Sequence, residues 1–381
     1  MKLSRSVKIA AVAVAALALG AQTAFAAVTI TAGGSSFDAP ILNSCKVAWQ
    51  TSTGNTFTYN SSDSGTGQKN EDAGIFDSNW SDSSYTPAKA SVLQIPVVMA
   101  PIAVIYNLPG NKDLYLSQKT LSDIFAGVVT KWNDPEIAAD NNGSATSVVY
   151  AKDASGNVKK DASGNPVVLR TVVTQRHYTL PNQPIHLIAR SDASGTTKNF
   201  VTLFKTQFPS LWTKALDKTF ANDFPGNIND PANIGRIQTA SGSTGVAALM
   251  NKTPYSIGYA ETSYATGSIR AALIQNANGD FAGPTAAATA AFVGSATVVN
   301  GGYKFDYNTK TPGAYVLGIV SYVLVDSAAS GANAAATTDF IKYVLSPACS
   351  TSAGAVAGGF AQVSGSVLAY DNSLIAKLPT K

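Results

Sequence analysis

One stretch decides the fold of this chain: Ala189-Arg190-Ser191-Asp192-Ala193-Ser194-Gly195-Thr196-Thr197-Lys198-Asn199-Phe200. An apolar run at residues 185–189 leads into it and predicts a buried strand. After it, Phe200, Phe204 and Phe208 recur every four residues, which predicts one face of a helix. A strand, a short turn and a helix form the repeating unit of α/β proteins, so we expect an α/β fold.

The turn inside this segment predicts a site for a small oxyanion. Ser194, Gly195 and Thr196 would open the helix, where backbone N–H groups attract negative charge. Their hydroxyls add hydrogen-bond donors, and Arg190 adds a charged planar fork. The same residues also fit a helix capped by a serine, with an exposed arginine before it. The segment alone leaves both interpretations open.

The first 26 residues predict a secretion signal. Three basic residues precede an apolar run at 9–19, and Ala24-Phe25-Ala26 fits the small-x-small cleavage rule. The apolar run is too short for a membrane span, and no cysteine near the cleavage site could carry a lipid. We therefore expect a periplasmic protein that is exported, soluble and not lipid-anchored.

Removal of this signal lowers the net charge of the chain. The signal holds three cations and no acid, so the formal net charge falls from +4 to +1. A chain so close to neutral, without a dense Lys/Arg cluster, gives no reason to expect a nucleic-acid partner. About 355 residues would remain, which is enough for two domains.

The two cysteines and two histidines limit the chemistry. Cys45 and Cys349 are an even pair in an exported protein, which favours a disulfide over two isolated buried thiols. His177 and His186 lie apart from any cysteine or carboxylate cluster, so we expect no metal site and no cofactor.

Strands and helices alternate along most of the chain. Two long apolar runs, at 92–107 and 314–325, predict extended crossings. The other expected elements are strands at 28–31, 56–59, 73–76 and 255–259, a polar loop at 60–67, and helices at 35–50, from 121, from 132, at 246–250 and at 339–345.

The segment 141–184 differs from the rest in being polar. It holds two copies of Asp-Ala-Ser-Gly, at 153–156 and 161–164, which invite comparison with Asp192-Ala193-Ser194-Gly195. Neither copy precedes an amphipathic helix, and no carboxylate ladder for calcium surrounds them. We interpret them as hairpin turns on a surface insertion, which is either a solvated decoration or a contact for another partner.

Several motifs in order resemble the phosphate-binding protein of the bacterial phosphate ABC transporter. The resemblance covers nearly the whole chain after the signal, except 141–184. Its motifs are Ala32-Gly33-Gly34-Ser35-Ser36-Phe37-Asp38-Ala39-Pro40, the run from Tyr59 to Gly67, Gly74-Ile75-Phe76-Asp77 followed by Ser81-Asp82, Arg190-x-Asp192-x-Ser194-Gly195-Thr196, the run from Trp132 to Ile137, Thr244-Gly245-Val246-Ala247, and Ile257-Gly258-Tyr259-Ala260-Glu261.

The resemblance implies a two-lobed periplasmic binding protein of the type II-like class, with the ligand cleft between the lobes. Two crossover strands, near 97–98 and 318–319, would join them. Lobe I would comprise 27–98 plus 319–381, and lobe II 99–318. Both cysteines then fall in lobe I, where a disulfide would tie its two pieces together.

The resemblance also implies a set of phosphate ligands. Arg190 would supply the positive charge, and Asp192 would hold its guanidinium in place. The expected ligands are Ser36, Phe37, Ser64, Asp77, Arg190, Ser194, Gly195 and Thr196.

Asp77 and Asp38 each fit two different roles. Asp77 would accept the proton that hydrogen phosphate carries and sulfate lacks, although it also fits a helix cap or a turn. Asp38 replaces a proline of the family pattern. It would either weaken anion binding by facing the pocket or cap the helix that starts beside it.

By this resemblance the protein is a monomer that binds inorganic phosphate and delivers it to a membrane permease, without catalysis. A rival is a secreted phosphatase on the same scaffold. Against it, neither histidine is placed to activate a serine. An extracellular phosphate scavenger without a permease is a third possibility that the sequence leaves open.

Overall fold

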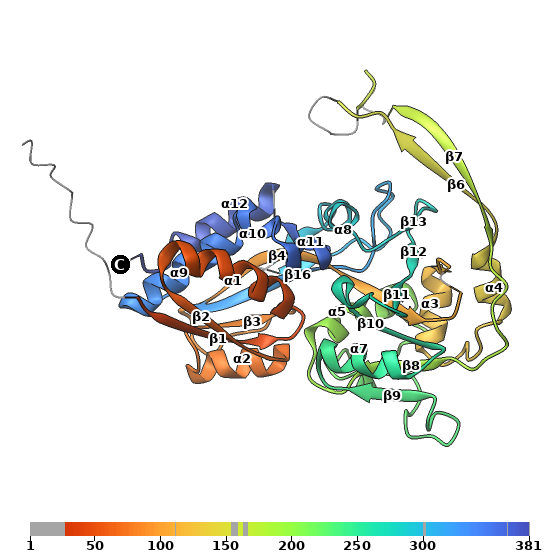
Figure 1. Ribbon diagram of the computed structural model, residues 1–381, viewed down its shortest axis with the longest axis horizontal. Helices are drawn as coiled ribbons and strands as arrows, with labels where there is room; N and C mark the ends of the chain where they lie inside the picture. Colours follow the sequence, from red (N-terminus) through yellow and green to blue (C-terminus); the bar gives the residue numbers. More distant parts are fainter. Residues whose placement is uncertain are drawn as a thin grey trace, which may run out of the picture.

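The computed structural model describes residues 27–110, 112–153, 159–162, 167–299, 302–363 and 365–380. The predicted signal lies outside the described residues, as does most of the two Asp-Ala-Ser-Gly copies in the insertion. The rest forms two α/β lobes side by side, joined through the middle by long strands (Figure 1). The expected two-lobed α/β fold is confirmed.

Eight strands form one hydrogen-bonded path in the order β2-β1-β3-β16-β4-β10-β8-β9. At one end β1, β2 and β3 are parallel, and at the other end β8, β9 and β10 are parallel. The bounds along this path are β1 Thr29–Ser35, β2 Thr56–Ser62, β3 Ser78–Ser81, β4 Val92–Asn107, β8 His186–Arg190, β9 Ile237–Ala240, β10 Ser256–Glu261 and β16 Gly318–Asp326.

The two expected crossings are β4 and β16. The first part of β4, residues 92–101, pairs antiparallel with β16, and residues 102–107 pair with β10. Nearly every residue of both strands is buried, which explains why each is predominantly apolar, although Pro96 and Pro101 interrupt the first. The residue limits assigned to the two lobes stay a prediction.

Helices cover both lobes. Around the first lobe lie α1 Ala39–Thr53, α2 Ser64–Ala73, α9 Ala332–Val344, α10 Pro347–Ser350, α11 Ala353–Ala357 and α12 Gly365–Ile375. The remaining helices are α3 Gln118–Phe125, α4 Pro135–Asn141, α5 Gly195–Gln207, α6 Phe220–Asp223, α7 Gly242–Lys252, α8 Ala286–Val293 and the 3-10 helix η1 Thr262–Tyr264. No helix in the described part of the chain is long and apolar enough to cross a membrane.

Short strands complete the structure. They are β5 Tyr115–Leu116, β11 Arg270–Ala271, β12 Leu273–Gln275, β13 Phe281–Ala282, β14 Thr297–Val299, β15 Gly302–Lys304 and β17 Ala361–Gln362. Among them, β11 pairs with β4 near its C-terminal end, at Ile105 and Tyr106, and β17 pairs with its middle, at Val98 and Met99.

The helix after the opening segment packs as its phenylalanine spacing predicts. Phe200 and Phe204 of α5 are fully buried, with their ring centroids 4.9 Å apart. Phe200 stacks on Tyr259 of β10 at 4.5 Å, and Phe125 of α3 contacts both phenylalanines. This aromatic cluster fixes α5 against the sheet and so sets the position of its N-terminus.

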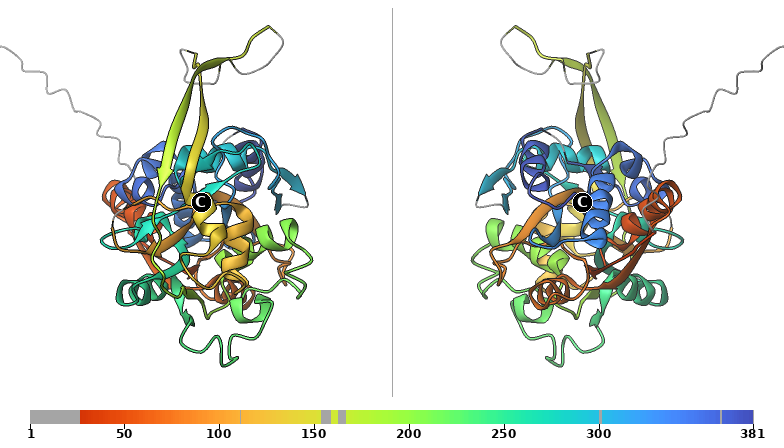
Figure 2. Two further views of the ribbon diagram at one scale, coloured as in Figure 1. Left: turned by 90° about the vertical axis from the view of Figure 1, so that its right-hand side faces the viewer. Right: turned by 90° about the vertical axis from the view of Figure 1, so that its left-hand side faces the viewer.

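The polar insertion forms a long antiparallel hairpin. Strands β6 Asn142–Tyr150 and β7 Val168–His177 pair along their length and project well beyond the lobes (Figure 2). Three apolar side chains of β7, Val168, Leu169 and Val173, are exposed on it. The hairpin rises from the outer side of the second lobe, beside α4 (Figure 1).

The expected strand at 73–76 and the expected loop at 60–67 are wrong. Instead β2 continues to Ser62, and Asp63 caps helix α2 by accepting a hydrogen bond from the Thr66 amide at 2.8 Å. The helix ends at Gly74, whose φ of 68° lies in the left-handed region that glycine adopts readily because it has no Cβ. A polar helix with little apolar periodicity gives a weak sequence signal, and it displaces the next strand to Ser78–Ser81.

The disulfide is confirmed. It joins Cys45 of α1 to Cys349 of α10 across 304 residues of sequence, with the Cα atoms 5.0 Å apart. It therefore ties the N-terminal part of the first lobe to its C-terminal helices.

We predict that reduction destabilises the protein by about 5 kcal/mol, because the bond closes a very long loop in the unfolded chain. Urea unfolding with and without reductant measures the change. A thiol assay on denatured, unreduced protein should find no free thiol, whereas two free thiols or an unchanged urea midpoint would contradict the assignment.

Candidate functional site

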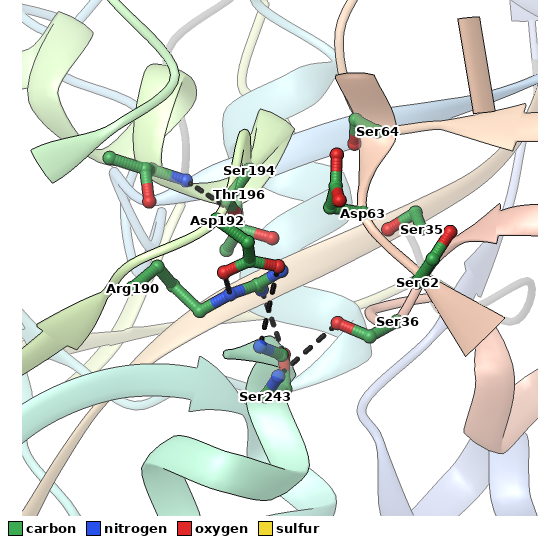
Figure 3. A network of polar contacts seen from close by, with 12 residues as sticks. Ser35, Ser36, Ser62, Asp63, Ser64, Arg190, Asp192, Ser194, Thr196 and Ser243 are labelled. Carbon is green, nitrogen blue, oxygen red and sulfur yellow. Dashed lines mark hydrogen bonds and ion pairs between the residues drawn. The ribbon is translucent and has the colours of Figure 1, made fainter. Parts of the chain in front are cut away.

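The polar residues gather where the parallel strands of the two lobes end. Strands β1, β2 and β3 end at Ser35, Ser62 and Ser81, and β8 and β10 end at Arg190 and Glu261. Ligands of open α/β sheets bind at the carboxyl ends of strands, so this edge is the expected place for a site. Figure 3 shows serines of the first lobe and Arg190, Ser194 and Thr196 of the second reaching toward the same space.

Asp82, directly after β3, is the centre of this cluster. Its carboxylate accepts hydrogen bonds from the Ser35 hydroxyl at 2.8 and 2.9 Å and from the Thr196 hydroxyl at 2.9 Å. Ser64 donates weakly at 3.5 Å and also accepts the Asp82 amide at 3.1 Å. Asp82 is 2% exposed. Its donors therefore come from both lobes.

Burial raises the pKa of Asp82 above its ordinary value. Hydrogen bonds from Ser35 and Thr196 lower it again, and so does the charge of Arg190. These donors favour the charged form, which is the form that can accept a proton from a ligand.

Arg190 is the buried cation of the site. Its guanidinium makes a two-pronged ion pair with Asp192, Nε to Oδ1 at 2.7 Å and the terminal nitrogen to Oδ2 at 2.6 Å. Its other terminal nitrogen donates to the Ser243 hydroxyl at 3.3 Å. Burial lowers the pKa of Arg190, but Asp192 more than reverses this, so the guanidinium stays charged.

The N-terminus of α5 lies at the contact between the two lobes. The Ser194 hydroxyl caps the helix by accepting the Thr197 amide at 3.1 Å. Gly195 lies so close to the first lobe that a Cβ there would come within 2.5 Å of the Ser64 hydroxyl and 3.0 Å of the Asp82 Cβ. A side chain at 195 would therefore push the lobes apart.

Ser36 and Phe37 also lie in the cluster. The Ser36 hydroxyl accepts the Ser243 amide from α7 at 3.2 Å, and the Phe37 amide donates to the Ser35 hydroxyl at 3.1 Å. The Phe37 ring itself is buried and packs edge-on against Phe360.

Backbone contacts join the lobes around these side chains. The Gly65 amide donates to the Ala193 carbonyl at 3.0 Å, and the Asn199 amide group donates to the Asp82 carbonyl at 2.6 Å. Lys218 donates to the side-chain oxygen of Gln68. The structure therefore has the lobes in direct contact over the site.

Asp77 is not part of this cluster. Its carboxylate accepts the Thr31 amide at 2.7 Å and the Thr31 hydroxyl at 2.8 Å, and Asn333 bonds its other oxygen. Asp77 precedes β3 whereas Asp82 follows it, and four residues of strand separate the two ends by roughly 13 Å. The expected place of Asp77 at the anion site is therefore wrong.

Asp38 does not cap its helix. It is the N-cap residue of α1 but makes no side-chain cap hydrogen bond. Its buried carboxyl accepts from the Ser321 hydroxyl of β16 at 2.7 Å, on the side that faces Asp82. Of the two expectations for this residue, the structure supports the one that turns it inward.

Sequence reasoning missed several members of the cluster. Ser35 directly precedes the predicted ligand Ser36, and Ser81-Asp82 belongs to the same motif as Asp77, the aspartate that the sequence favours. Ser243 and Ser321 gave no separate signal, because a serine in a helix start or an apolar strand is common. The described residues contain no group of His, Cys, Asp and Glu arranged to hold a metal ion.

Comparisons with known proteins identify the family of the chain. The PBP superfamily domain matches residues 20–348. The chain is 31% identical over 280 residues to the phosphate-binding protein PstS of Haemophilus influenzae, covering 71% of this chain and 69% of that protein. It is 29% identical over 317 residues to PstS3 of Mycobacterium bovis, covering 78% and 73%.

Solved structures show the same fold. An ancestral soluble variant of the human phosphate-binding protein superposes with a TM-score of 0.67 at 18% identity, over 91% of this chain and 93% of that one. The phosphate-bound periplasmic protein PfluDING superposes with a TM-score of 0.64, also at 18% identity and with the same coverage. The chain belongs to the PBP superfamily, within the family of PstS phosphate-binding proteins.

Proposed function

We propose that this protein binds inorganic phosphate between its lobes and delivers it to the permease of a phosphate ABC transporter. The observation that carries the proposal is the Asp82 carboxylate. It is buried among hydroxyls of both lobes, and the positive charge of Arg190 lowers its pKa. The relatives named phosphate-binding protein support the choice of ligand.

Phosphate would take the hydroxyl and amide donors that now surround Asp82. Ser64 and Thr196 already point at this carboxylate, and the first amides of α5 add the positive end of a 13-residue helix. Arg190 would supply the full positive charge, held in orientation by Asp192. The proposed ligands are Ser36, Phe37, Ser64, Asp82, Arg190, Ser194, Gly195 and Thr196.

Asp82 would decide which anion is accepted. Hydrogen phosphate carries a proton that a buried carboxylate can accept, whereas sulfate at the same place would leave two acceptors facing each other. Leaving a buried charged acceptor without a donor costs about 1–3 kcal/mol or more. One carboxylate is therefore enough to separate two tetrahedral ions of similar size.

The finer parts of the proposal concern partners and location. We propose a monomer that acts outside the cytoplasm and is not lipid-anchored. We also propose that it carries phosphate without catalysing a reaction, as befits a transport substrate-binding protein. A mixture with a phosphate monoester, monitored for released phosphate, should show none above the buffer control.

We predict that Asp82→Asn reduces the preference for phosphate over sulfate by about tenfold or more, because the amide can donate to sulfate and no longer accepts as a charged group. Calorimetric titration with both anions measures the ratio. Asp77→Asn is the matched control and should keep the wild-type ratio. An unchanged ratio in Asp82→Asn, or a loss in Asp77→Asn, would contradict the assignment.

We predict that Gly195→Ala weakens phosphate binding by about tenfold or more, because the added methyl group meets Ser64 and Asp82 across the lobe contact. Gly283→Ala is the control, since nothing lies within 4 Å of a Cβ at that position. Tryptophan fluorescence titration gives both affinities. Equal affinities in the two variants would show that the close contact at 195 is not required.

A further inference from the structure

Asp38 carries a carboxyl that is buried beside the proposed phosphate site. The side chain is fully buried and forms no ion pair with any described residue. Its Oδ2 accepts the Ser321 hydroxyl at 2.7 Å, while Oδ1 has no hydrogen-bond donor. An ionised carboxylate in such a place would carry an uncompensated charge, which is strongly unfavourable.

Too few hydroxyl hydrogens surround the carboxyls of Asp38 and Asp82. The Ser321 hydroxyl lies 2.7 Å from Asp38 Oδ2, 3.3 Å from Asp82 Oδ1 and 3.4 Å from the Ser81 carbonyl. It has one hydrogen for three acceptors. Ser321 thus lies between the two carboxyls, and two negative charges so placed repel unless one of the carboxyls carries a proton.

The other groups that face Asp38 do not supply a cation. Besides Asp82 they are Glu261 at the end of β10 and Tyr59 of β2, whose hydroxyl donates to the Ser35 carbonyl at 2.7 Å. Arg190 is already paired with Asp192. The cluster therefore holds three buried carboxyls for one partly neutralised guanidinium.

We propose that Asp38 is a further member of the anion site: a neutral carboxylic acid that donates its proton toward Asp82, so that the two carboxyls share one negative charge. This rests on the proposed function of the site. Asp38 then has two effects on the ligand. It withholds a second charge that would repel phosphate, and it satisfies one side of Asp82 while Asp82 stays ionised to accept from the ligand.

The titration of the neighbouring groups is consistent with this arrangement. Burial raises the pKa of Asp38 well above its ordinary value, and the charge of Asp82 raises it further, although Ser321 lowers it. Burial also raises the pKa of Glu261 to about 8. Both shifts favour the neutral form of these two groups, whereas hydrogen bonds from Ser35 and Thr196 favour the charged form of Asp82.

The first test reads the proton directly and needs no ligand. In protein labelled with ¹³C at aspartate carboxyls, the resonance that disappears in Asp38→Asn should have the chemical shift of a neutral carboxyl at about pH 7. Glutamate carboxyls are silent in this experiment, so Glu261 does not interfere. If the resonance shows that the Asp38 carboxyl ionises below about pH 5, as exposed aspartates do, the proposal is overturned.

The second test uses phosphate binding by the neutral isostere. Asp38→Asn keeps the shape, the neutrality and a donor toward Asp82, whereas Asp38→Leu is neutral but has no donor, so the phosphate affinity of Asp38→Asn at about pH 7 should exceed that of Asp38→Leu by about tenfold or more. If Asp38 is ionised in the complex, removing its charge tightens binding by about tenfold or more. A loss of that size would equally contradict a neutral donor. Asp77→Asn, a change at an aspartate outside the site, should match the wild type.

The two tests separate this inference from the proposed function. If wild-type protein binds no phosphate, the proposed function fails, yet the carboxyl resonance still reports the protonation of Asp38. If phosphate binds but the Asp38 carboxyl ionises below about pH 5, only the proposed protonation of Asp38 fails.

Discussion

The burial of the Asp82 carboxylate is the constraint on which the site depends. A charge at 2% exposure is tolerated only if its lone pairs receive donors and a cation lies nearby. Ser35 and Ser64 meet part of this need from the first lobe. Thr196 meets the rest from the second, so satisfying one carboxylate also brings the lobes together.

The same constraint explains the position of the surrounding elements. The donors sit at the carboxyl ends of parallel strands, and α5 is fixed there by its phenylalanine face rather than by its polar residues. Arg190 is the last residue of β8, so its place follows from the strand, and Asp192 fixes its orientation two residues later. Packing thus positions the second lobe's half of the site, and hydrogen bonds orient it.

Much of this arrangement could be predicted from the sequence. The two crossing strands followed from long apolar runs, and the turn from Arg190 to Thr196 followed from a strand, a cap and a phenylalanine-spaced helix. The sequence favoured Asp77 over Asp82 because the polar helix α2 has no clear apolar face, so its presence and the start of β3 at Ser78 could not be predicted. An error of a few residues moves an aspartate from one end of a strand to the other. Ser321 could not have been found, since its role arises only where β16 passes between Asp38 and Asp82.

We conclude that the buried carboxylate and guanidinium together would select a protonated tetrahedral anion. Calorimetric titration of the wild-type protein with phosphate and with sulfate, at equal ionic strength near pH 7, tests it most directly. We expect one phosphate per chain and an affinity for sulfate lower by about tenfold or more. Equal affinities, or no heat with phosphate, would contradict the account.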